Sequence, residues 1–194
     1  DSVINGVGPA GENMLVLCED REFLVTKNNQ RIKVGDTGCV SADSVVGYKT
    51  VTLWASMEGY NIWTGSETLK ISSAVDDIWN AMTTEQKQLV RAEILGSTIY
   101  IWVGTITDPE NSNRTIPNII LTYDISKNAW NRLSTGISVT DFHKYRTSAG
   151  EALFAGASTG GVYEMFSGGS QAGVDFSSSF ETHWNYGSGP GVVD

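Results

Sequence analysis

The sequence predicts an all-β protein with one short helical insert. Its 194 residues include 21 Gly against 4 Pro, while aromatic residues make up 10% of the chain and charged residues only 18%. Abundant Gly, many aromatics and few charges favour short strands joined by tight turns over a helical bundle. A chain of 194 residues is also the size of one domain and is long enough to bury a substantial core.

The segment 51–72 shows the predicted strand pattern most clearly. It contains three short runs rich in Val, Thr, Trp, Tyr and Ile, separated by breaks that hold Gly59 and Gly65. Such residues suit a pleated surface, and Gly permits the positive φ of a tight hairpin. We therefore expect an antiparallel meander with strands at 51–55, 60–63 and 69–71.

The same signals place strands along the rest of the chain. Residues 1–13 contain Gly and Pro without periodicity, so we expect a linker or incoming arm there, and residues 185–194 are expected to be a Gly-rich terminal linker. Residues 39–46 form either a strand or a loop, and 108–118 are expected to be a polar loop. Further strands are predicted at 14–18, 23–26, 31–34, 97–105, 119–125, 129–133, 152–156, 161–165 and 174–184.

The helical insert is predicted within residues 73–95. Apolar residues recur there at helical spacing, and acidic residues favour the positive N-terminal end of a helix. Ser72 or Ser73 is the expected N-cap. Residues 83–86 resemble a second helix start, and 91–95 either extend that helix or enter a strand. The residues that carry this pattern are Val75, Asp76, Asp77, Ile78, Trp79 and Met82.

Three stretches share one order of features, namely a strand, a turn of small residues and an aromatic-containing strand. They are residues 53–63 (LWASMEGYNIW), 153–163 (LFAGASTGGVY) and, more weakly, 15–24. Repeats of about 40 to 50 residues, each a meander of about four strands, are typical of propeller blades. We expect blades over residues 14–184, and their small number indicates part of a larger propeller. The side chains expected between sheets are Trp54, Ile62, Ile101, Trp102, Leu121, Tyr123, Leu153, Phe154 and Val162.

Charge and cysteine content narrow the functional classes. The formal charge of -9 argues against a basic surface for nucleic acid or anionic lipid, and no run approaches the roughly 20 apolar residues of a membrane span. The printed sequence starts at Asp1 rather than Met, so we expect a processed chain or a piece of a longer one. Cys18 and Cys39 are expected to be reduced and buried rather than joined in a disulfide.

No group of residues forms a convincing catalytic, cofactor or metal site. His143 and His183 lack metal-ligand spacing, so we interpret both as surface or structural residues. Asp76 and Asp77 are adjacent and point in different directions on a helix. The oxygen-rich loop at 108–113 could hold calcium, but it lacks the spacing of a known loop and we expect it to be solvated. The Trp and Tyr residues could form a sugar platform, yet in a meander they more often pack between blades.

Two resemblances arise from these motifs. Residues 123–130 (YDISKNAW) resemble one kelch blade. A larger part of the chain, about 53–184, resembles β-propeller virion proteins of tailed bacteriophages, the tail hub, nozzle or packaged-DNA stabilisation group. The motifs that carry this second resemblance are 54–65 (WASMEGYNIWTG) with 69–72 (LKIS), 121–130 (LTYDISKNAW), 153–163 (LFAGASTGGVY) and 180–184 (FETHW).

The phage resemblance implies a non-enzymatic ring subunit of the virion tail, assembled in the host cytoplasm. Its implied partners are other tail or portal-adaptor proteins and copies of itself, and it implies no cofactor. An acidic chain is compatible with a channel through which DNA passes without sequence-specific binding, since phosphates are repelled. The alternatives are a kelch-like or sugar-binding propeller adaptor and, less favoured, a propeller glycosidase, which needs two converging carboxylates.

Overall fold

In the computed structural model, which describes residues 2–148, 150–166, 170–171 and 174–175, antiparallel strands dominate and fall into successive meanders. The first sheet contains β1 (Ile4–Ala10), β2 (Asn13–Cys18), β3 (Glu22–Val25) and β4 (Arg31–Gly35). The second contains β5 (Val46–Tyr48), β6 (Val51–Ala55), β7 (Tyr60–Trp63) and β8 (Thr68–Lys70). The third contains β9 (Arg91–Leu95), β10 (Thr98–Asp108), β11 (Asn111–Asp124) and β12 (Ala129–Ser134). The fourth contains β13 (Val139–Thr147), β14 (Gly150–Ala157) and β15 (Val162–Glu164), and a short pair, β16 (Ser170–Gln171) and β17 (Val174–Asp175), follows it.

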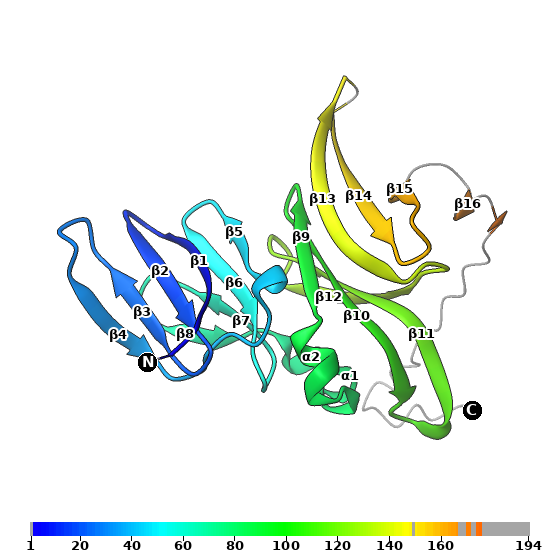
Figure 1. Ribbon diagram of the computed structural model, residues 1–194, viewed down its shortest axis with the longest axis horizontal. Helices are drawn as coiled ribbons and strands as arrows, with labels where there is room; N and C mark the ends of the chain where they lie inside the picture. Colours follow the sequence, from blue (N-terminus) through cyan, green and yellow to red (C-terminus); the bar gives the residue numbers. More distant parts are fainter. Residues whose placement is uncertain (1, 149, 167–169, 172–173, 176–194) are drawn as a thin grey trace, which may run out of the picture.

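The four sheets follow one another in an open arc (Figure 1). The blue first sheet and the yellow to orange fourth sheet lie at opposite ends of the picture, with the second and third between them. Neighbouring sheets meet through their first strands, because β1 contacts β5 and β6, β5 contacts β9, and β9 contacts β13 and β14. Meanders placed side by side about a common centre are propeller blades. The predicted all-β fold with propeller-like blades is therefore confirmed.

Three apolar clusters fill the three junctions between consecutive sheets. Trp54 and Trp63 of the second sheet pack with Leu15 and Leu17 of the first. The second and third sheets enclose a larger cluster, and Ile120 of the third sheet packs with residues of the fourth. Each junction removes apolar side chains from water, which is the main favourable term in stacking blades.

The helical insert lies between the second and third sheets. It comprises a 3-10 turn at Ser72–Val75, α1 (Asp76–Ala81) and α2 (Thr84–Gln88), so the predicted place of the helices is confirmed. Ile78 and Trp79 of α1 are buried in the large junction cluster. Residues 91–95 form β9 rather than more helix.

The two helix starts differ in how well the sequence predicts them. Thr83 caps α2 through a capping box, in which its hydroxyl accepts a hydrogen bond from the Gln86 amide while the Gln86 side chain accepts one from the Thr83 amide. The predicted Ser cap of α1 is wrong. The residue before α1 is Val75, and the Ser72 hydroxyl instead accepts from the Tyr60 amide at 3.0 Å, which ties the insert to β7.

Two other predictions are corrected, and one further strand was not predicted. Residues 4–10 form β1, paired with β2 along its length, rather than a linker. Much of the expected loop at 108–118 is a long hairpin, because β10 ends at Asp108 and β11 begins at Asn111. No element was predicted for Val139–Thr147, which forms β13. In each case backbone pairing with a neighbouring strand overrides a polar or Gly-containing sequence.

The predicted core is confirmed at five of its positions. Trp54, Ile101, Leu121 and Leu153 are fully buried and Tyr123 nearly so. Ile62, Trp102 and Phe154 are half-buried. Val162 is 73% exposed, so its predicted burial is wrong. Cys18 and Cys39 are both buried and are not joined in a disulfide. Most of the expected strand at 174–184 and the whole of 185–194 lie outside the described residues.

Candidate functional site

The residues considered for catalysis are not brought together. His143 is exposed on β13, and His183 lies outside the described part of the chain. Asp76 accepts a hydrogen bond from Lys70 Nζ at 2.9 Å, which links α1 to β8, while Asp77 is exposed beside it. The two carboxylates therefore face different surroundings, as adjacent helical residues must.

The oxygen-rich turn at 108–113 uses its oxygens internally. Asp108 Oδ1 accepts from the Glu110 amide at 3.0 Å, and Asn111 Oδ1 accepts from the Asn113 amide at 3.1 Å. The second Asp108 oxygen lies 3.7 Å from Arg114 Nε. These are the local bonds of Asx turns. Within the described ranges there is no group of three or more His, Cys, Asp or Glu side chains that could hold a metal ion.

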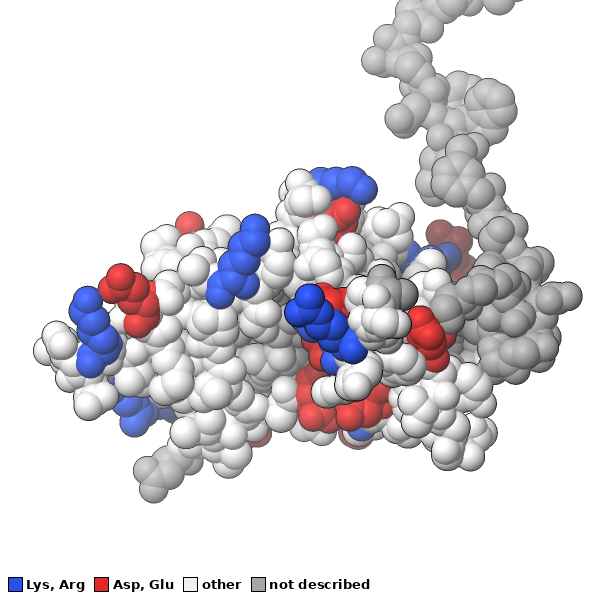
Figure 2. Space-filling view, turned by 90° about the horizontal axis from the view of Figure 1, so that it is seen from above, with Lys and Arg blue, Asp and Glu red and all other residues white. Residues whose placement is uncertain are grey.

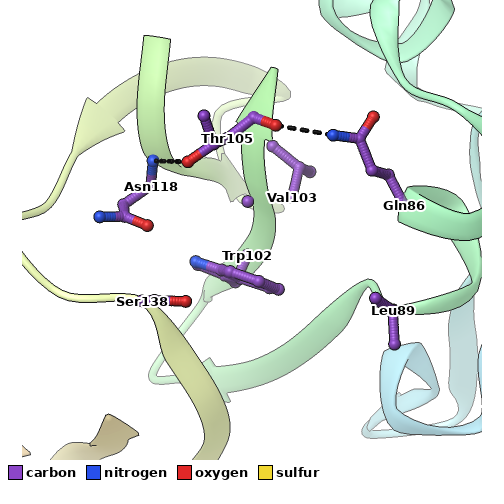
Figure 3. Close-up of a pocket in the computed structure, with 8 residues that line it drawn as sticks. Gln86, Leu89, Trp102, Val103, Thr105, Asn118 and Ser138 are labelled. Atoms are coloured by element: carbon purple, nitrogen blue, oxygen red, sulfur yellow. Dashed lines mark hydrogen bonds between the residues drawn. The ribbon is translucent and has the colours of Figure 1, made fainter. Parts of the chain in front are cut away.

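A small pocket of about 250 Å³ lies where α2 meets β10 and β11 (Figure 3). The Gln86 amide nitrogen donates to the Thr105 carbonyl at 2.7 Å, and the Thr105 hydroxyl accepts from the Asn118 amide at 3.2 Å. The Trp102 ring lies on one side with Ser138 near it. Every side chain that lines the pocket is neutral, so the pocket offers surface and hydrogen bonds for binding but no acid or base.

Burial shifts the pKa of several titratable groups outside the lining of this pocket, among them Glu22, Cys39 and Lys87. Burial raises the pKa of the Glu22 carboxyl, and the amides of Thr37 and Gly38 offset this only in part. Burial also raises the pKa of the Cys39 thiol to about 11, which keeps it protonated and inert. Burial lowers the pKa of Lys87, whose Nζ donates to the Met57 carbonyl at 2.8 Å. None of the three side chains lines the pocket, so none supplies it with an acid or a base.

The most distinctive surface is the outer face of the first sheet, called here the first-sheet face. A groove of about 390 Å³ runs along it. In the strand register Val7 lies opposite Val16, and Val16 lies opposite Phe23, so one apolar row crosses three strands. The Arg31 guanidinium lies 3.7 Å from the centre of the Phe23 ring. The residues that define this face are Ile4, Val7, Met14, Val16, Phe23, Val25 and Arg31.

The outer face of the fourth sheet, called here the fourth-sheet face, ends the other side of the arc. Phe142 and Leu153 point to the third sheet, so the alternating residues point away from it. Tyr145 is 61% exposed and Val162 73% exposed. The rings of Tyr145 and Phe154 meet edge to face at 6.4 Å. The face is defined by Asp141, His143, Tyr145, Phe154, Val162 and Glu164.

Charged side chains of both signs are interspersed on the face of the molecule drawn in Figure 2. In the view of Figure 2, Lys and Arg lie beside Asp and Glu, with wide uncharged areas between them. Ion pairs such as Lys70–Asp76 and Lys144–Glu151 join opposite charges. In this view no broad basic surface of the kind that tracks a phosphate backbone is present. None of the described helices is long and apolar enough to cross a lipid bilayer.

Comparison with known proteins supports the fold alone. No family model matches the chain, and no curated protein matches it. The extracellular domain of a putative one component system from B. thetaiotaomicron is similar at a TM-score of 0.51 with 10% identity, over 84% of this chain and 21% of that one. A computationally designed protein, Ika4, aligns at 0.49 with 12% identity, over 84% of this chain and 91% of that one.

The WD40 domain of Neurospora crassa Pan2 aligns at a TM-score of 0.47 with 10% identity, over 84% of this chain and 46% of that one. The chain therefore spans about a fifth of the B. thetaiotaomicron protein and about half of the Pan2 domain chain. Identities this low carry information on architecture and none on ligand or reaction.

Neither outer face is predicted by the sequence pattern considered above, although β2 carries one signal for the first-sheet face. Residues 14–18 read Met, Leu, Val, Leu, Cys, so both faces of this strand are apolar. A strand with one solvated face alternates, whereas a strand covered on both sides does not. The run therefore indicates that both faces of β2 are suited to burial against other parts of a protein.

Proposed function

We propose that this chain is a non-enzymatic structural subunit whose blades join neighbouring subunits in a ring-shaped assembly. The observation that carries the proposal is the pair of outer faces at the ends of the arc, each holding exposed apolar or aromatic side chains. Exposed apolar faces rimmed by polar residues are typical of protein interfaces. A blade stacks on two neighbours, and each end blade of this arc has one neighbour among the described residues.

The resemblance of motifs 54–65, 121–130 and 153–163 to β-propeller virion proteins gives the assembly we favour. In that setting the chain is a hub or nozzle type subunit of a phage tail, present in the virion after assembly in the host cytoplasm. It contacts other tail or portal-adaptor proteins. The net charge of -9 favours passage of DNA over binding to it, because acidic surfaces repel phosphates.

Genetic complementation in particles tests this proposal. Single Ala replacements of His183, Asp76, Asp77, Asp108 or Glu110, none of which belongs to either outer face, are expected to leave particle assembly and infectivity near wild type. Deleting residues 73–82 of the helical insert removes Trp79 from the central junction and is expected to abolish incorporation into tails. Incorporation is measured by quantitative mass spectrometry of purified particles. Assembled but non-infective particles after a single His or carboxylate replacement, with loss of polysaccharide cleavage, would replace this proposal with the glycosidase.

One observation favours a second candidate, the sugar-binding adaptor. The pocket at Trp102 combines an indole ring with neutral amide and hydroxyl groups from Gln86, Thr105 and Asn118, the kinds of group that hold carbohydrates. A glycan array followed by calorimetry decides between the candidates. Saturable binding that Asn118→Ala weakens and that His143→Ala leaves unchanged would favour the adaptor.

A further inference from the structure

The first-sheet face is built to be covered. Cys18 and Phe23 line the groove on the outer side and are only 3% and 8% exposed, and the Arg31 guanidinium lies over the Phe23 ring. Val7 and Met14 on that face remain 55% and 42% exposed. A partner that covered this groove would complete the second apolar side of β2, as the second sheet completes the first.

The fourth-sheet face has complementary charge. Arg31 stands on the first-sheet face, and among the residues that the structure describes no ion pair includes it. The nearby charges Arg21 and Lys33 are already paired, with Asp20 and Asp36. The fourth-sheet face carries Asp141 and Glu164 beside its aromatic pair. Opposite potentials on two surfaces favour their encounter and fix their register.

Geometry favours joining these two unlike faces over joining two like ones. Each sheet has one face toward the preceding sheet in the chain and one face toward the following sheet. At every internal junction, the face of one sheet that is directed toward the following sheet packs on the face of that following sheet that is directed toward the preceding one. The first-sheet face is the side on which a preceding sheet would pack, and the fourth-sheet face is the side on which a following sheet would pack. Joining these two faces therefore repeats the internal junction. Joining two first-sheet faces would place Arg31 near its own copy and would reverse the order of strands.

We propose that the first-sheet face of one copy binds the fourth-sheet face of a second copy of this chain. This inference rests on the proposed structural function and names its partner. The contact is heterologous, so an open assembly of any size keeps one free first-sheet face at one end and one free fourth-sheet face at the other until the arc closes. Two or more copies therefore continue the arc of blades and complete a ring when the rotation per copy closes.

Paired blocking variants of the 194-residue chain test the contact. Val7→Asp blocks the first-sheet face and Val162→Asp blocks the fourth-sheet face, and both side chains are exposed enough for the fold to tolerate the change. Light scattering after size-exclusion chromatography should give the wild-type chain at least twice the monomer mass of 21.0 kDa. Each variant alone should be monomeric. Leu89→Asp is the matched control, since Leu89 is 54% exposed and off both faces, and it should associate like the wild type.

Mixing the two variants is the decisive measurement. One intact face of each kind remains in the mixture, so it should form a dimer and grow no further, whereas the double variant should stay monomeric in every mixture. Association lost in Val7→Asp but kept in Val162→Asp would mean that like faces meet and would overturn the proposal. A monomeric wild type across the concentration series, or association unchanged by both variants, would also overturn it. If the chain is monomeric but is still incorporated into tails, the contact between copies is contradicted and the proposed function is not. If the chain associates but is absent from infective particles, the proposed function is contradicted and the contact between copies is not.

Discussion

The two sides of the first sheet both carry apolar side chains, but they differ in how far those side chains are exposed to solvent. On the inner side Leu15 and Leu17 are fully buried against Trp54 and Trp63 of the second sheet. On the outer side, Met14 of the same strand and Val7 of the neighbouring β1 stay half exposed. The hydrophobic pattern of a strand therefore specifies that a face should be buried, but a neighbouring sheet decides whether it is.

The comparison also separates stability from assembly. A side chain on the inner side contributes to the free energy of unfolding of a single chain, because its burial exists in that chain. A side chain on the outer side contributes only when a partner covers it. Substitutions on the two sides should therefore change different measurements.

The largest loss of stability is expected from Trp54→Ala on the inner side. The side chain is fully buried, and its Nε1 donates to the Gly38 carbonyl at 2.8 Å. The free energy of unfolding should fall by about 3 to 5 kcal/mol, as large-to-small core changes do. Urea titration followed by fluorescence measures it, with Trp54→Phe as a control that keeps most of the volume. A loss below about 1 kcal/mol would mean that the first and second sheets do not pack as described.

Neighbouring residues of β2 give the direct test of the two sides. Leu15→Ala should cost about 2 to 5 kcal/mol in urea, because the cavity forms inside the first junction. Met14→Ala, on the opposite face, should cost less than about 0.5 kcal/mol at a concentration where the chain is monomeric. Equal losses from the two substitutions would show that the outer side is covered within one chain.

The cap of α2 should contribute less. Thr83→Ala removes the hydroxyl that accepts from the Gln86 amide and should lower the free energy of unfolding by about 1 kcal/mol. Thr83→Ser keeps the acceptor and should stay near wild type. Thermal melts of both variants provide the measurement, and equal shifts in the two would rule out the cap as the cause.

The smallest effect is a change with pH at Glu22. Burial raises the pKa of this carboxyl in the folded chain, so the fold favours the protonated form. The contribution of Glu22 to the free energy of unfolding is therefore greatest below the pKa of 4.5 that the group has in the unfolded chain. That contribution is lost as the pH rises through the higher pKa of the folded chain. Glu22→Gln should flatten that part of the stability profile, as measured by urea titrations across the pH series. An unchanged slope would show that Glu22 titrates normally.

Several features of this molecule follow from local sequence alone. Runs such as 51–55 and 60–63 pair as expected, since β-branched and aromatic residues flank a Gly-containing turn. The capping box at Thr83 and Gln86 and the turn after Tyr123 are also local. In that turn Asp124 Oδ1 accepts from the Ser126 amide at 2.9 Å, and the Tyr123 hydroxyl donates to Asn128 at 2.9 Å. Residues within a few positions of one another supply every partner that these structures need.

The tertiary structure decided what depends on distant partners. Residues 4–10 became a strand because β2 offers them a ladder, and Ser72 bonds β7 instead of capping a helix. Val162, apolar by sequence, is exposed because it alternates away from the third sheet. The two outer faces exist only because four blades form an open arc. Hydrophobic pattern fixes which faces avoid water, but the order in which sheets stack decides which faces find a partner.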